Sequence, residues 1–179
     1  MTESIPASIE MALRGETMRL STYIESALFQ IIISGNVANG RENAINFLRL
    51  TFGEKLKQAK ELIIQQAPNI YNEKKLLFQY LNDICKFRNV MAHCPFIWKD
   101  GDTSFFGFWD VVVPENKSDF QYIDSFKYQL QDAVANIKSM GTLAVQTIEL
   151  AALFQSHVGV DIKFFDQLQT EINKRQQNG

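Results

Sequence analysis

The sequence predicts an all-α fold, an up-and-down bundle of four to five helices with a small β-hairpin inserted after the helix that ends near residue 93. First, apolar residues recur at helical spacing over most of the 179 residues. Second, aromatic and β-branched residues cluster between residues 96 and 114. Third, 46% apolar and 21% charged residues are typical of a soluble globular protein, and no long linker divides the chain. We therefore expect a single domain over residues 1–179.

The first part of the chain predicts a long amphipathic helix, a turn-rich break and two shorter helices. The long helix is expected over about residues 8–34, because aliphatic residues recur there at roughly helical spacing: Ile9, Leu13, Leu20, Ile24, Leu28 and Ile31. Glycines and asparagines between residues 34 and 40 indicate a turn. A short helix is expected over 41–50 and a clearer one over 54–66, which Pro68 should stop.

The next helix contains the most informative stretch of the chain. Asn72 is its expected N-cap, because an asparagine side chain suits the first amides of a helix and the acidic Glu73 follows in the first turn. Pro95 cannot continue a helix, so this one should end near His93. The apolar stripe of the helix is expected to be Leu77, Tyr80, Leu81, Ile84, Phe87 and Met91.

The predicted hairpin occupies about residues 96–114. Residues near 96–98 are expected to pair with residues 105–113, because both stretches are rich in aromatic and β-branched side chains. The turn between them is Lys99-Asp100-Gly101-Asp102, and Pro114 is expected to end the second strand.

Two helices are expected after the hairpin. The first is long, covers about residues 121–154 and takes Asp119 as its cap. The second is amphipathic and covers residues 161–174. The polar tail over residues 174–179 is expected to be flexible.

The composition excludes several broad classes of function. The net charge of −2 and the pI near 5.7 are not those of a general nucleic-acid binder, so any RNA contact has to come from a local patch. Two cysteines are too few for a disulfide framework and suit a reduced compartment. No secretory signal is visible, and the apolar stretches are too short to span a membrane. We expect a cytoplasmic protein with no membrane partner.

No motif indicates a metal or a cofactor. The chain has no Walker-type loop, no dinucleotide fingerprint and no helical zinc-protease motif. Cys85 and Cys94, together with His93, do not have the spacing of a zinc site, so the cysteines are expected to be small packing residues. We expect neither metal nor cofactor.

Residues 84–96 read Ile-Cys-Lys-Phe-Arg-Asn-Val-Met-Ala-His-Cys-Pro-Phe and bring a cation, an amide and a proton carrier to a helix end. Arg88 has a permanent charge and a planar fork that suits a phosphate. His93 can give or take a proton near neutral pH. Asn89 can orient the phosphate or the imidazole by hydrogen bonding. These groups are those needed to cleave an RNA phosphodiester without a metal.

The spacing of the motif raises a geometric question. Five residues correspond to about 140° on an ideal helix, so Arg88 and His93 do not share one helix face. One solution is that the helix unwinds near Ala92 and brings His93 round. The other is that two copies of the protein pack about a two-fold axis, and each supplies an arginine and a histidine to a shared cleft. The sequence leaves both solutions open.

The segment Arg-Asn-Val-Met-Ala-His, residues 88–93, resembles the signature of HEPN (higher eukaryote and prokaryote nucleotide-binding) domains. That signature is an arginine, a polar residue directly after it, a few more residues and a histidine, near the end of a helix in an all-α bundle. The family includes many metal-independent endoribonucleases of toxin–antitoxin and other defence systems, in which the motif pairs across a homodimer. The resemblance implies that Arg88, Asn89 and His93 are catalytic, that RNA is the substrate, and that an antitoxin protein is a possible partner.

Two residues before the motif are candidates for substrate binding. Lys86 can contact a phosphate, and Tyr80, two turns before Arg88, can flank a cleft. Each also has an ordinary interpretation, because Lys86 suits a solvated helix face and Tyr80 suits the apolar stripe. His157, the only other histidine, is expected to have a plain role at a helix C-terminus.

An alternative interpretation applies to the whole motif. Arginine and histidine near a helix C-terminus interact favourably with the helix dipole, so Arg88 and His93 also fit an ordinary helix end. The chain would then be a non-catalytic helical module that binds a protein or a nucleotide. In that case Arg88 and His93 should be buried or paired with carboxylates, and the aromatic hairpin could serve as a docking surface.

Overall fold

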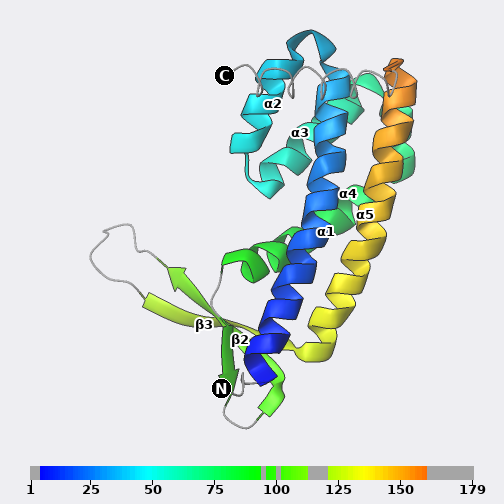
Figure 1. The fold of residues 1–179 in the computed structure, drawn as a ribbon. Coiled ribbons are helices and arrows are strands. Elements are labelled where there is room, and N and C mark those ends of the chain that lie inside the picture. The colour runs from blue at the N-terminus through cyan, green and yellow to red at the C-terminus, as the bar shows by residue number, and fades with distance from the viewer. Residues whose placement is uncertain (1–4, 94–95, 100–101, 113–120, 161–179) are drawn as a thin grey trace, which may run out of the picture. The chain divides into compact units, whose positions relative to one another are not determined.

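The computed structural model describes residues 5–93, 96–99, 102–112 and 121–160, and helices dominate these residues (Figure 1). The predicted helical character is thus confirmed. The chain divides into two compact units, each assembled from separate segments. The first unit combines Met1–Glu25 with Leu77–Gln146, and the second combines Ser26–Leu76 with Thr147–Gly179. A single domain over residues 1–179 stays a prediction.

Helix α1, Ile5–Gly35, contributes residues to both units. Its bounds are close to those expected from the apolar spacing. Leu13, Leu20 and Ile24 are buried in the part that belongs to the first unit. The part that belongs to the second unit is more apolar, and its buried apolar residues are Ala27, Leu28, Ile31, Ile32 and Ile33.

The second unit contains the 3₁₀ turn η1, Val37–Asn39, and the helices α2, Gly40–Arg49, and α3, Phe52–Gln66. Helix α3 begins before the expected residue 54 because Thr51 and Glu54 form a capping box. The Thr51 hydroxyl accepts a hydrogen bond from the Glu54 amide, and the Glu54 carboxylate accepts one from the Thr51 amide. Such a pair satisfies two of the otherwise unpaired amides at a helix start.

Close packing at the end of α1 explains why residue 35 is a glycine. A Cβ atom at Gly35 would overlap the side chain of Leu62 in α3. A larger residue at position 35 would therefore require the Leu62 side chain to move.

Helix α4 covers Pro68–His93, so the predicted N-cap at Asn72 is wrong. Proline fits the first helical position because the amide that it lacks has no partner there in any helix. Pro68 therefore starts α4 as well as following α3. The buried residues of α4 are Leu77, Phe78, Leu81, Ile84, Phe87, Val90 and Met91.

A three-stranded antiparallel sheet stands where the sequence predicts a two-stranded hairpin. Its strands are β1, Phe96–Lys99, β2, Asp102–Val112, and β3, Gln121–Gln129, in the order β1-β2-β3 (Figure 1). Between β1 and β2, Phe96 lies opposite Phe108 and Trp98 opposite Phe106.

The predicted helix over residues 121–154 is wrong in its first part, because residues 121–129 form β3. This stretch is rich in aromatic and β-branched residues, which favour a strand, and pairing with β2 supplies its backbone with hydrogen-bond partners. A third strand also adds stability that an isolated hairpin lacks.

Helix α5, Leu130–Val158, follows β3 directly. Asp119 is therefore not its cap. Met140, Leu143, Leu150 and Phe154 are among the buried residues of α5. The predicted helix over 161–174 and the tail over 174–179 lie outside the described residues. In the part of the chain that the structure describes, no helix has both the length and the apolar character needed to cross a membrane.

Candidate functional site

The motif lies in the last turns of α4, in the first unit. Helix α4 stays α-helical through His93, so the first of the two solutions, an unwinding of the helix near Ala92, is not seen. The side chains of Arg88 and His93 therefore leave the helix about 140° apart. The arrangement with two copies stays a prediction.

Arg88 is directed toward α1 rather than toward solvent. Its Nη2 donates to Oε1 of Glu25 at 3.1 Å, and the two side chains are only 14% and 21% exposed. An ion pair with this little exposure is weakly screened by salt and solvent. Glu25 thus fixes the direction of the guanidinium, although the sequence motif does not include it.

In this structure Asn89 is hydrogen-bonded to Arg88. Its Oδ1 accepts a hydrogen bond from Nη1 of Arg88 at 3.2 Å, and its Nδ2 donates to Sγ of Cys85 at 3.8 Å. The guanidinium is therefore held by a carboxylate from α1 and an amide from its own helix. These contacts orient the guanidinium, and the two roles predicted for Asn89, orienting the phosphate or the imidazole, stay predictions.

Burial raises the pKa of the Cys85 thiol, and the nearby Arg88 charge and the Asn89 hydrogen bond oppose this effect only partly. A raised pKa keeps the thiol protonated near neutral pH, where it is a poor nucleophile. Cys85 therefore serves the site as a packing and hydrogen-bonding group. Cys94 lies outside the described residues.

A second arginine ties α1 to the end of α4. Nη1 of Arg14 donates to the backbone carbonyl of Met91, and Nε of Arg14 donates to Glu10 at 2.8 Å. Met91 is in the last turn of α4, where carbonyl groups have no partner within the helix. Arg14 thus caps the turn that leads to His93.

The residues that the sequence motif missed share one stripe of α1. Arg14, Thr17, Ser21 and Glu25 follow one another at spacings of three or four residues, so they lie on one face. Thr17 and Ser21 are almost fully buried. The signal in the sequence was polar residues at helical spacing beside the apolar stripe, which is unusual for a face that is not exposed.

The two histidines have different surroundings. His93 is exposed at the last position of α4. His157, in the second unit, lies with Nε2 3.1 Å from the carbonyl oxygen of Gln66, the last residue of α3. An N–H at that position caps the C-terminus of α3, so His157 has the plain terminal role that was expected.

The two candidates for substrate binding line one groove between α4 and α5 in the first unit. Tyr80 is 55% exposed, so its predicted place in the apolar stripe is wrong. The buried stripe of α4 does not include Tyr80, because Phe78 and Leu81 occupy the core positions of this helical turn. Lys86 lies on the rim of the same groove. Whether either residue binds substrate stays a prediction.

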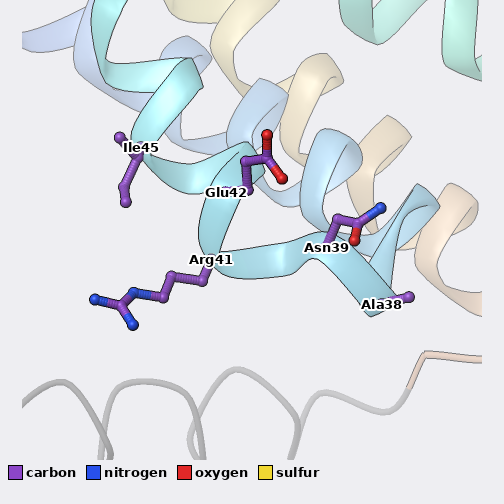
Figure 2. Close-up of a pocket in the computed structure, with 5 residues that line it drawn as sticks. All are labelled: Ala38, Asn39, Arg41, Glu42 and Ile45. Carbon is purple, nitrogen blue, oxygen red and sulfur yellow. The ribbon is translucent and has the colours of Figure 1, made fainter.

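Another hollow, in the second unit, gathers no reactive groups. It is lined by η1 and the start of α2, and Figure 2 shows that the Arg41 and Glu42 side chains extend in different directions. Among the described residues, no three His, Cys, Asp or Glu side chains lie close enough together to hold a metal ion.

No known protein family, curated protein or solved structure matches this chain. The function therefore has to be inferred from the residues and geometry of the chain itself.

Proposed function

We propose that the chain is a metal-independent endoribonuclease of HEPN type, which acts as a homodimer in the cytoplasm. The observation that supports this most is the environment of Arg88. Its guanidinium is anchored by Glu25 and Asn89, one turn before the exposed His93. A cation that is already held in place stabilises a charged transition state without the cost of reorganisation.

In the proposed reaction the 2′-oxygen of a ribose attacks the adjacent phosphorus, and the bond from phosphorus to the 5′-oxygen breaks. One His93 removes the proton of the 2′-hydroxyl, and the His93 of a second copy protonates the leaving 5′-oxygen. Arg88 binds the non-bridging oxygens and stabilises their added negative charge. Asn89 keeps the guanidinium in position. The products are a 2′,3′-cyclic phosphate and a free 5′-hydroxyl.

The proposal needs two copies because Arg88 and His93 point in different directions from one α4 helix. Two-fold symmetry would place the His93 of each copy opposite the Arg88 of the other and would supply both the base and the acid. If the enzyme is a toxin, its antitoxin would cover or modify this shared cleft.

The test is cleavage of single-stranded RNA in EDTA by the purified chain and by His93→Ala. Loss of a general acid or base costs about 100-fold or more, so His93→Ala should lose nearly all activity. His157→Ala is the matched control, because it removes the other histidine far from the motif in sequence, and it should cut like the parent. The fragments should end in a cyclic phosphate, and a 2′-deoxy substrate should resist.

Equal cutting by the parent and by His93→Ala would show that the activity lies elsewhere. The dimer is tested separately by light scattering coupled to gel filtration. A folded parent that stays monomeric at working concentration contradicts the two-copy site.

A second candidate function is a non-catalytic helical module that binds a protein or a nucleotide. The observation in its favour is the pairing of Arg88 with Glu25, which neutralises the cation at low exposure. Under this alternative, the parent binds RNA weakly or not at all and never cuts it. Replacement of Glu25 distinguishes the two functions, as described in the Discussion.

A further inference from the structure

The groove between α4 and α5 has no part in the proposed reaction, yet it directly precedes the motif along α4. Its volume is about 520 Å³, within the range typical of small-molecule sites. Ile84, Phe87 and Leu143 form an apolar floor, and all three are buried. An apolar floor suits a flat, weakly hydrated group such as an aromatic ring.

The rim of the groove is polar and nearly neutral in charge. Asp83 and Lys86 contribute one charge of each sign, so the groove does not favour a ligand with several phosphates. The α5 side adds amides and a hydroxyl, which can both donate and accept hydrogen bonds. The rim residues that bear on the argument are Tyr80, Asp83, Lys86, Asn136, Ser139 and Gln146.

These groups match the parts of a single nucleotide. An exposed tyrosine such as Tyr80 offers a face on which a base stacks. The amides of Asn136 and Gln146 can bond to the edge of a base, and the Asp83 carboxylate can accept from an amino group or a ribose hydroxyl. Lys86 supplies one cation for one phosphate.

The direction of α4 connects the groove to the motif. Lys86 and His93 are seven residues apart, which places them on nearly the same line of the helix, about 10 Å apart along its axis. Both side chains are exposed. A strand of RNA that has one phosphate at Lys86 would therefore run toward His93 and not round the helix.

We propose that this groove holds one unpaired nucleotide of the RNA, with its base against Tyr80 and its phosphate at Lys86, beside the linkage that His93 acts on. The inference rests on the proposed function, since it assigns the subsite next to the cut. Such a subsite reads the identity of one base, because the amides on its rim face the edge of that base. It also explains how a chain of net charge −2 binds RNA through a local contact.

The test is binding of a short fluorescent single-stranded RNA to His93→Ala, measured by anisotropy in EDTA. In this background Tyr80→Ala should weaken binding about 5- to 150-fold, the range for loss of one stacked base. Tyr80→Phe keeps the ring and should bind like the parent. The matched control is Tyr23→Ala, because Tyr23 is a similarly exposed tyrosine on α1 that does not line the groove.

Two further measurements make the result decisive. RNA that carries 5-iodouridine should crosslink on irradiation to the α4 peptide that contains Tyr80. Unchanged binding by Tyr80→Ala, or crosslinks confined to other peptides, overturns the inference. If uridine or adenosine monophosphate displaces the RNA at concentrations equal to its own Kd, the groove is a site for a free nucleotide and the RNA subsite is wrong.

Failure of the proposed function is seen separately. If the parent cuts no RNA in EDTA, the nuclease is excluded whatever happens at Tyr80. If the parent cuts, His93→Ala does not and Tyr80→Ala cuts and binds normally, only the subsite is excluded.

Discussion

The two parts of helix α1 present different chemistry to the units in which they lie. In the first unit the stripe that faces α4 is polar, with Arg14 and Glu25 bonded to the motif helix. In the second unit the buried positions are apolar except for Ser34, and Leu28, Ile31 and Ile33 have no exposed surface at all. One continuous helix thus combines a surface that holds the end of α4 with a surface that packs a core.

The difference indicates which part of the helix contributes more to stability. A buried aliphatic side chain stabilises a fold by about 1.5–3 kcal/mol. A buried ion pair, in contrast, is often no better than an apolar pair of similar volume, because both charges lose their hydration. The polar stripe is therefore better explained by the need to hold Arg88 and the end of α4 than by stability.

The largest expected effect comes from the apolar part. Ile31→Ala should lower the free energy of unfolding by about 2–5 kcal/mol, because it leaves a cavity in a core that is closely packed. RNA cleavage per folded molecule should stay the same, since Ile31 belongs to the second unit and the motif to the first. Urea denaturation and a cleavage assay on the folded fraction measure the two quantities. A specific loss of cleavage without loss of stability would contradict this division of roles.

A smaller effect is expected in the polar part, from Glu25→Ala. Breaking the pair removes the partner of a mostly buried guanidinium and should cost about 1–3 kcal/mol of unfolding free energy. Cleavage should fall as well, because Arg88 loses its anchor. Glu25→Gln keeps a hydrogen-bond acceptor for Arg88. It should therefore retain much of the stability and much of the cleavage.

The same variants separate the two candidate functions. If Glu25 only neutralises Arg88, as in a non-catalytic module, Glu25→Gln should bind RNA more tightly than the parent and still not cut it. A parallel rise in binding and cleavage would mean that Glu25 restrains the enzyme and does not position its arginine.

Most of the helical fold could be predicted because its apolar spacing is long and regular. The errors are at helix ends and in one strand. Asn72 resembles an N-cap, but α4 begins at Pro68, because proline is favoured at the first helical position. Residues 121–129 resemble a helix in sequence, because Phe126 and Leu130 also fit helical spacing, but they form β3. Their pairing with β2 is a contact between distant residues that no local pattern contains.

The site could be predicted only in part, for a similar reason. Arg88, Asn89 and His93 are local in sequence, so a motif identifies them. Glu25 is 63 residues away from Arg88, and Arg14 is 77 residues away from Met91, so only the folded chain brings them together. The groove that contains Tyr80 and Lys86 likewise depends on α5. A polar stripe on a buried helix face was the one signal that the sequence offered.

The smallest effect tests whether the polar stripe as a whole serves the site. Thr17 is fully buried, and its Oγ1 has no hydrogen-bond partner within the described part of the chain. Valine has nearly the same shape and helix propensity. Thr17→Val should therefore raise the free energy of unfolding by about 1 kcal/mol, which corresponds to about 2–4 °C in Tm.

Ser21→Ala is the matched control for this measurement. The Ser21 hydroxyl donates to the Thr17 carbonyl at 2.8 Å, so its removal should leave stability unchanged or lower it slightly. If Thr17→Val lowers Tm, the hydroxyl has a partner that stabilises the fold. If Thr17→Val raises Tm but reduces cleavage, the Thr17 hydroxyl lowers stability and serves the site. Arg14 and Glu25 are also expected to serve the site. Unchanged cleavage would limit the functional part of α1 to its two charged residues.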